Sequence, residues 1–393
     1  MNRRRFLAIV GGGVVLAAGA GTVRVMRSPA QASAPWRAAG SDYTEPRRKA
    51  LSYAILAPNP HNQQPWKVDL SVPDEVTLYA DANRLLPHTD PNNRQITIGL
   101  GCFLELLVMA AAQDGFRVDL DLFSHGSNAD ALDERPVATA RFTSDASIKL
   151  DPLFAYVLDR RSNKEVYDTT RDVNGSTLTR IAAAARKNRI GWTNNPTEVA
   201  KLRELTIAAS TIEMETARTH KESIDVMRIG AKEVIANPDG IDLTGPLMEG
   251  LSAAGMLSRD DMLLPGQTGF EQGRDAILGP PATAMAHMWM VSSGNSRSDQ
   301  ISAGRDWVRV HLACTAEGID MQPHSQALQE YPEMAQLYKQ VHDMWAAEGG
   351  TVQMLIRLGY GEAVNASPRW PLEAKVIGEK SVKVGAPYRR ATG

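Results

Sequence analysis

The chain is poor in cysteine, carries almost no net charge and contains no low-complexity tract or short repeat. Its 393 residues have a formal charge of −2 at pH 7. That balance gives no electrostatic argument for binding nucleic acid or an anionic membrane surface. What is present is the composition of a globular protein, with length enough for two ordinary domains or one large duplicated domain.

The two cysteines, Cys102 and Cys314, lie in apolar helical contexts. The sequence has no Cys-x-x-Cys pair and no metal-ligand spacing, so no metal site is expected. An oxidising compartment would allow a disulfide, but two buried structural cysteines fit these contexts better.

The N-terminus has the features of an export signal. A basic Met1–Leu7 segment precedes an apolar Ala/Gly/Val stretch, and small residues follow at Ala30–Ala32, which predicts a signal peptide over 1–32. The Arg3-Arg4-x-Phe-Leu pattern resembles a twin-arginine signal, a receptor-read address. The apolar stretch is short and glycine-rich for a membrane span. We therefore expect export by the Tat pathway to the periplasm, or tethering to the membrane by an uncleaved signal.

The rest of the chain divides into a linker and two halves. Residues 33–44 are polar and predict a linker, 45–150 form the first half, and 151–393 form the second half with a C-terminal tail. Residues 96–113 are apolar nearly all round and predict a buried central helix in the first half, and 302–317 predict a second buried helix in the second half. Alternating patterns predict strands at 66–70, 76–80, 118–123, 138–142 and 285–292.

Two short motifs stand out by their spacing. Residues 57–66 read Ala-Pro-Asn-Pro-His-Asn-Gln-Gln-Pro-Trp, and residues 160–164 read Arg-Arg-Ser-Asn-Lys. In an extended segment, Arg160, Ser162 and Lys164 would point to one side and offer two cations and a hydroxyl, as a phosphate requires.

Both motifs resemble signatures of the nitroreductase-like FMN proteins, in which the basic motif normally comes first. The inverted order resembles the fused Acg-type branch, where one chain mimics the usual homodimer. The resemblance implies an α+β, nitroreductase-like fold with three α-β-α layers, formed by two related halves as a pseudo-dimer. It also implies one FMN per chain, held between the halves, in a monomer.

The resemblance assigns the FMN phosphate to the basic motif. Arg160, Ser162 and Lys164 correspond to the family's basic segment, and Arg369, in Ser-Pro-Arg-Trp-Pro, corresponds to its C-terminal arginine. The other interpretation of the pentapeptide is a solvated helix end. The matching position of Arg369 favours the phosphate interpretation.

Two further segments are assigned to the flavin ring by the same resemblance. Asn59, Pro60 and Asn62 match the family loop that lies against the ring, although Asn59 and Pro60 replace its serines. Gln64 and Trp66 are interpreted as structural, and His61 as a loop residue near the ring.

The second ring segment covers the N5 and O4 edge in the family. Here it consists of Pro323, His324, Ser325 and Gln326. The family's Glu-Gly is replaced by Ser325 and Gln326, which puts NAD(P)H use in doubt.

Residues 237–281 form a long irregular segment with Met248, Leu251, Met256 and Met262. Such a segment is functional or disordered in most domains. It is either a lid over the flavin or a surface excursion packed on its own cluster.

The function implied is an exported FMN oxidoreductase that transfers hydride or electrons to a small quinone, nitro or enone acceptor. The alternative is a protein that sequesters FMN under a lid without efficient turnover. No residue is assigned a catalytic role.

Overall fold

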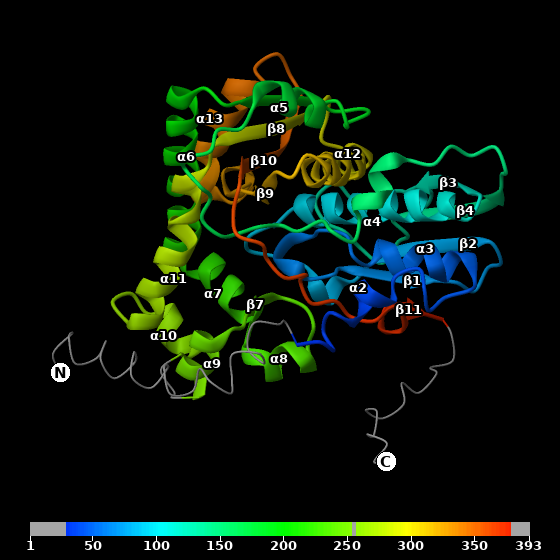
Figure 1. Cartoon of the computed structure of the whole chain (residues 1–393), viewed down its shortest axis with the longest axis horizontal. Helices are drawn as coiled ribbons and strands as arrows, with labels where there is room; N and C mark the ends of the chain where they lie inside the picture. The colour runs from blue at the N-terminus through cyan, green and yellow to red at the C-terminus, as the bar shows by residue number, and fades with distance from the viewer. Residues whose placement is uncertain (1–28, 254–256, 379–393) are drawn as a thin grey trace.

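The computed structural model describes residues 29–253 and 257–378 (Figure 1). Most of the expected signal peptide, and Met256 of the candidate lid, lie outside the described residues.

The helices are α2 (Ala34–Ala38), α3 (Pro46–Ala54), α4 (Arg94–Gln113), α5 (Gly175–Ala182), α6 (Pro196–Glu215), α7 (Ala217–Asp225), α8 (Gly230–Ala236), α9 (Pro246–Ala253), α10 (Arg259–Leu263), α11 (Thr268–Leu278), α12 (Arg297–Ala316) and α13 (Ala335–Trp345). The strands are β1 (Trp66–Asp69), β2 (Glu75–Ala80), β3 (Phe116–Leu122), β4 (Ala138–Ser144), β5 (Arg189–Thr193), β6 (Met227–Ile229), β7 (Ile241–Leu243), β8 (Ala286–Ser292), β9 (Asp320–Pro323), β10 (Thr351–Gly359) and β11 (Val376–Ile377).

Two sheets, one from each half, define an α+β architecture. Sheet A has the order β11-β1-β2-β4-β3, and sheet B the order β5-β8-β10-β9. All pairs in both sheets are antiparallel except β1 with β11. Sheet A contains the sequential pairs β1-β2 and β3-β4 and takes its edge strand β11 from the second half, whereas sheet B joins strands that lie far apart along the second half.

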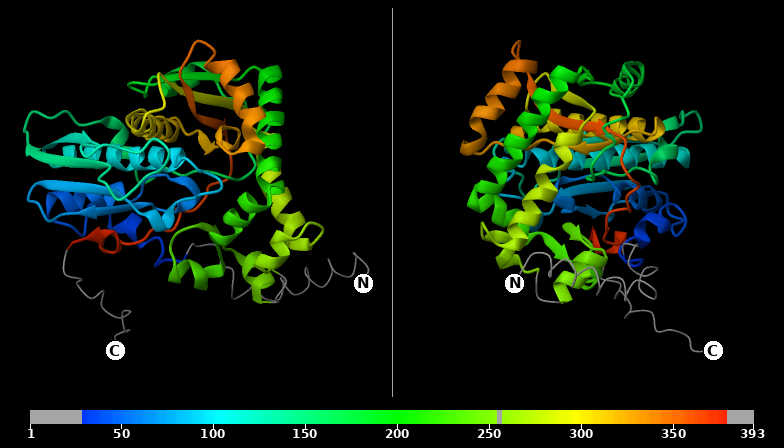
Figure 2. Two further views of the ribbon diagram at one scale, coloured as in Figure 1. Left: turned by 180° about the vertical axis from the view of Figure 1, so that it is seen from behind. Right: turned by 60° about the vertical axis from the view of Figure 1, so that its left-hand side comes forward.

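Helices α4 and α12 form the centre of the molecule and lie side by side in Figures 1 and 2. Gly101 and Gly304 allow this approach, because a Cβ on Gly304 would overlap the Ile98 carbonyl oxygen and one on Gly101 the Ile301 carbonyl oxygen. α4 is long and apolar enough to cross a membrane, yet 89% of its apolar window is buried inside the protein. It is the core helix that the sequence predicted.

Sheet B is the middle of three layers. On β10, Met354 and Ile356 pack towards α12, whereas Val352 and Leu355 pack in a second core formed with α6 and α13. Because both faces are covered, all of β10 is buried. Sheet A buries one face in the α4 side of the core, and the alternate residues of β3 are exposed. The polar alternation of β3 follows from that one-sided burial.

The strands and central helices predicted from the sequence are confirmed within a few residues, but the linker prediction for 33–44 is wrong. That segment contains α2, whose Trp36 is buried in the main core together with Ala39. The division at residue 150 also needs a correction. The tail of the second half returns to the first, where β11 pairs with β1, as the red strand beside the blue elements shows in Figure 1.

Residues 217–253 and 257–278 form a lobe at one end of the molecule, built of helices α7–α11 and the short parallel sheet β6-β7 (Figure 2). It has its own small core of Ile224, Met227, Ile229, Leu257 and Met262, against which Met248 and Leu251 pack. These side chains thus build the lobe, in the manner of a surface excursion with its own cluster.

The helix crossing generates a stability prediction. Gly304→Ala should lower the free energy of unfolding by about 3 kcal/mol, because the new methyl group meets a backbone carbonyl that cannot move aside. Chemical denaturation of the purified variant measures this. The matched control is Gly273→Ala in α11, where an added Cβ meets nothing within 4 Å; it should be neutral or stabilising by up to about 1 kcal/mol. Equal effects of the two substitutions would contradict the role of the crossing.

Candidate cofactor site

A strained loop over residues 59–64 lies at the end of α3. His61, Asn62 and Gln64 have positive φ values of 47°, 53° and 51°, a conformation that costs non-glycine residues free energy and clusters at functional sites. The loop packs on α4, since a Cβ on Gly99 would touch Asn59 and Pro60. The backbone conformation is therefore imposed by surrounding contacts and not by the local sequence.

The two asparagines expected at the ring hold this loop together. Asn59 accepts a hydrogen bond from the Gln64 backbone N–H at 2.7 Å and donates to the Ala57 carbonyl at 3.1 Å. Asn62 donates to the Pro368 carbonyl at 3.0 Å, and its oxygen accepts from Arg369. Both amides thus have protein partners, which leaves ring contacts to the loop backbone and to His61. Gln64 is fully buried and pins the loop, as expected.

The basic motif lies beside the loop. Arg160 is buried and donates to the Leu56 carbonyl at 2.9 Å, Ser162 is half-buried and pairs with Met321, and Lys164 is exposed. Burial, together with the charge of Lys164, lowers the pKa of His61 to about 4.

Arg369 joins the two halves at the same point. Its guanidinium donates to the carbonyls of Ile55, Leu56, Ala57 and Pro368 and to Asn62. These five bonds use all five of its N–H groups. Arg369 therefore contributes positive charge and braces the loop, while its hydrogen bonds stay within the protein.

Three guanidiniums surround the indole of Trp36. The Cζ atoms of Arg160, Arg161 and Arg369 lie 5.8, 4.8 and 5.5 Å from the ring centroid. We call these three residues the arginine cluster. In the part of the chain that the structure describes, no ion pair joins any of them to a carboxylate.

The cluster is electrostatically strained. Burial lowers the pKa of Arg160 to about 10, and burial with the neighbouring Arg160 charge lowers that of Arg369 to about 9. His311 stays neutral beside them, because burial and then Arg160 lower its pKa. Its Nε2 lies 2.8 Å from the Arg161 carbonyl and its Nδ1 3.4 Å from Arg160, so the proton belongs on Nε2. Asp159 and Asp242 offset part of the positive charge on Arg161 and Arg369, but neither forms an ion pair with the cluster. A largely buried group of cations without ion-paired carboxylates is suited to an anionic ligand.

The segment Pro323–Gln326 continues from β9, next to the basic motif. Ser325 exchanges hydrogen bonds of 3.1 Å with the backbone of Leu355, so its hydroxyl is used in the sheet. His324 Nδ1 and Gln326 Oε1 are buried without a partner among the described residues. Burial, with a smaller contribution from Arg357, lowers the pKa of His324 to about 3.

The residues present fit a flavin mononucleotide on these observations. His61 Nδ1, His324 Nδ1 and Gln326 Oε1 are buried polar atoms that need partners, and the arginine cluster needs an anion. The basic motif is joined to both neighbouring segments: Arg160 bonds the Leu56 carbonyl before loop 59–64, and Ser162 pairs with Met321 before the segment Pro323–Gln326. The described residues contain no group of three or more metal-ligating side chains.

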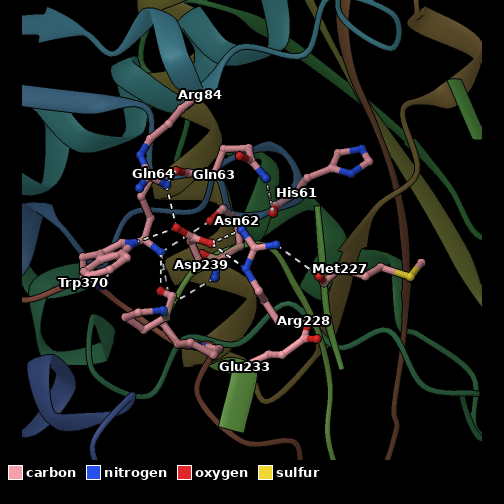
Figure 3. A network of polar contacts seen from close by, with 12 residues as sticks. His61, Asn62, Gln63, Gln64, Arg84, Met227, Arg228, Glu233, Asp239 and Trp370 are labelled. Carbon is pink, nitrogen blue, oxygen red and sulfur yellow. Dashed lines mark hydrogen bonds and ion pairs between the residues drawn. The ribbon is translucent and has the colours of Figure 1, made fainter. Parts of the chain in front are cut away.

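A second polar network closes the site on the side of the helical lobe (Figure 3). Asp239 is 2% exposed and accepts from Arg84 at 2.7 Å, Arg228 at 2.6 Å and the Trp370 indole at 2.7 Å. Next to it, Gly240 donates to the Asn62 carbonyl at 3.1 Å. Residues 238–240 are thus the part of the 237–281 segment that touches the loop.

Sequence reasoning missed Trp36, His311 and Asp239. A tryptophan inside a supposed linker was the one available signal for Trp36. His311 sits in a helix interior and Asp239 in a Pro-Asp-Gly turn, and neither pattern indicates a site.

The geometry defines an α+β protein with two sheets and a site built from both halves. No family model matches the chain. A Mycobacterium tuberculosis (strain ATCC 25618 / H37Rv) protein provisionally named an NAD(P)H nitroreductase is 23% identical over 336 residues, which cover 84% of this chain and 90% of that protein. The M. tuberculosis protein acg, provisionally named in the same way, is 26% identical over 118 residues, covering 30% of this chain and 35% of its own length.

Solved nitroreductases are similar to this chain at low scores. NfnB from Mycobacterium smegmatis, FMN-dependent and in complex with NADPH, is 17% identical with a TM-score of 0.33, covering 55% of this chain and 92% of its own. An FMN-bound nitroreductase from Bacteroides fragilis is 14% identical with a TM-score of 0.32, covering 61% of this chain and 100% of its own. At such scores these similarities carry no argument of their own.

The Asp239 network generates a prediction on stability and pH. Asp239→Asn should lower the free energy of unfolding by about 2–4 kcal/mol at neutral pH, because two arginines lose their shared carboxylate. Although burial alone would raise it, hydrogen bonds from Arg84 and Trp370 and the two arginine charges hold the pKa of Asp239 below its usual value. Its stabilisation is therefore present above about pH 4 and lost as pH falls through the lower folded-state pKa. The wild type and the variant should converge in acid.

The control is Asp343→Asn, which removes an exposed helix pair with Lys339 and should cost at most about 0.5 kcal/mol. Denaturation curves at pH 7 and pH 3 test both variants. If Asp239→Asn lowered the free energy of unfolding by the same amount at pH 7 and at pH 3, the electrostatic explanation would be contradicted.

Proposed function

We propose that the protein is an FMN-binding oxidoreductase of the nitroreductase-like family. The observation that carries the proposal is the arginine cluster at the junction of the two halves, in which Arg160 and Arg369 are buried, Arg161 is half-buried, and none has an ion-paired carboxylate among the described residues. The similarity to a provisionally named NAD(P)H nitroreductase over 84% of the chain supports the same class.

The phosphate of FMN is assigned to the arginine cluster and Ser162. Arg160 and Arg161 have N–H groups to spare, whereas Arg369 supplies charge only. The ring is assigned to the space bordered by loop 59–64, Lys164 and the segment Pro323–Gln326. One FMN per chain follows, since Arg369 and the basic motif occur once.

Bound FMN would supply hydride and single-electron transfer. The protein would contribute the positive charge of Lys164 near the ring and the neutral imidazoles of His61 and His324. An ammonium beside a flavin stabilises negative charge on its reduced form. We propose a small quinone, nitro or enone compound as the acceptor.

Export by the Tat pathway, with a final place in the periplasm or at the membrane, remains part of the proposal and rests on the N-terminal sequence. The twin-arginine route carries folded proteins, which suits a cofactor loaded before export. The two-sheet pseudo-dimer would act as a monomer.

A second candidate function is FMN sequestration. Trp36 covers the arginine cluster, and Asp239 with Gly240 seals the loop from the lobe side. Together with the altered Ser325-Gln326 segment, this enclosure favours slow exchange of both cofactor and substrates.

The phosphate assignment predicts the effect of cluster variants on FMN affinity. Arg161→Ala should raise the Kd for FMN at least about tenfold, since a charge-assisted hydrogen bond of about 1.5–3 kcal/mol is lost. Titration with quenching of flavin fluorescence measures it. Arg171→Ala, which removes an exposed arginine stacked on Tyr360, is the control and should bind FMN as the wild type does. Unchanged affinity in Arg161→Ala would contradict the assignment.

The two candidate functions differ in their response to a nicotinamide donor. The purified protein should show a flavin absorption spectrum, and anaerobic NADPH should bleach it within seconds if the protein is a reductase. Bleaching by dithionite alone would favour sequestration or a different donor. Colourless protein that cannot be reconstituted with FMN would contradict both.

A further inference from the structure

We propose that residues 32–40 form a strap that controls exchange of the cofactor, with Trp36 as its latch on the arginine cluster. The inference rests on the proposed FMN site and adds a gating element to it. It concerns a segment whose composition predicts only a linker, but which the structure places in the core.

The strap is bonded to the C-terminal segment that supplies Arg369. The Trp36 indole donates to the Ser367 carbonyl at 2.9 Å, and the Arg369 backbone donates to the Ala32 carbonyl at 2.9 Å. At its other end, Gly40 donates to Ser52 Oγ at 2.9 Å. Ala32 is 2% exposed and Trp36 is 7% exposed. The strap is therefore anchored at both ends and in the middle.

The latch acts on the cations that would bind phosphate. A cation over an indole gains about 0.5–2 kcal/mol, and Trp36 faces three guanidiniums at 4.8–5.8 Å. Because it excludes water, the indole also strengthens any attraction between the cluster and a bound anion. An anion that enters or leaves along the Trp36 side must first displace the ring.

Opening the strap would break few contacts with the rest of the protein. α2 has five residues, which is too short to be stable alone. Its ties to the rest of the protein are the Arg369–Ala32 backbone hydrogen bond, the Trp36–Ser367 and Gly40–Ser52 hydrogen bonds, the cation–π contacts and the burial of Ala32, Trp36 and Ala39. Such a segment belongs to the low-stability end of a fold, where local opening occurs without global unfolding.

A gate and a binding contact have different kinetic signatures. Removing a gate raises both the association and the dissociation rate constants, whereas removing a contact raises dissociation alone. Trp36→Leu keeps apolar volume in the core but removes the cation–π contacts and the Ser367 bond. We expect this variant to bind and release FMN at least about tenfold faster than the wild type. The Kd, the ratio of the two rate constants, should change by a smaller factor than either of them.

The experiment uses the full chain and stopped-flow flavin fluorescence. Association is followed after mixing apoprotein with FMN, and dissociation after adding excess apoflavodoxin-type scavenger protein. Arg37→Ala changes the exposed side of the same helix, where Arg37 bonds only Ser33 and Ala30, and should leave both rates unchanged. Trp36→Phe retains an aromatic face and should lie between wild type and Trp36→Leu.

Faster exchange in both directions for Trp36→Leu, with Arg37→Ala unchanged, supports the strap. Unchanged rates, or faster dissociation with unchanged association, overturn it while leaving FMN binding intact. A wild-type protein that binds no FMN overturns the proposed function and the strap together. Melting temperatures of the variants, measured in parallel without flavin, show whether each is folded.

Discussion

The close crossing of α4 and α12 is the constraint on which the rest of the structure depends. Two glycines replace side chains at the crossing, so backbone meets backbone where Ile98 and Ile301 carbonyls face the opposite helix. This contact fixes the distance between sheet A and sheet B. Loop 59–64 packs on α4 and the basic motif lies beside β9, so the spacing of the two helices also sets the spacing of the two sides of the site.

The candidate site contains positive charge, on the arginine cluster, that no ion pair among the described residues neutralises. Elsewhere a buried carboxylate balances arginines: Glu105, 1% exposed, pairs with the nearly buried Arg309 and with the more exposed Arg186 and Arg305. The arginine cluster has carbonyls, an indole and a neutral imidazole instead. Leaving cations in that state costs free energy, and the strained loop beside them adds to the cost. A ligand site requires such locally destabilising features, and the tightly packed core elsewhere compensates for them.

Much of the fold was predictable from periodicity, and less of the site. Helix α4 was evident because it is apolar nearly all round, whereas the buried face of α12 also contains Asp306, Arg309 and His311. The strands of sheet A were evident because only one face of that sheet is buried, so that apolar and polar residues alternate along each strand. β10 escaped prediction because both its faces are buried and the alternation disappears. The pattern also drew attention to Arg160, which bonds the Leu56 carbonyl shortly before loop 59–64, while its role at a phosphate stays a prediction.

What the sequence could not reveal are the partners brought by long-range contacts. Asn62 and Ser325 were expected at the ring, yet their hydrogen-bonding groups are used within the protein. Arg369 was expected at the phosphate, and it has no N–H group left to donate. Trp36 was hidden in a polar stretch, since nothing local predicts that residues more than 300 positions apart, Trp36 and Ser367, are bonded.

The meeting of the two ends of the chain has a consequence for the order of folding. Arg369 completes the bracing of loop 59–64, and β11 pairs with β1. Loop 59–64 and β1, which are synthesised early, therefore reach their final contacts only after residues 369–377 have been synthesised. Loop closure over some 300 residues comes late. During synthesis, the first half can form α3, α4 and most of sheet A, but it lacks its edge strand and its brace. The candidate site can therefore close only after residues 369–377 have been made and have reached the first half.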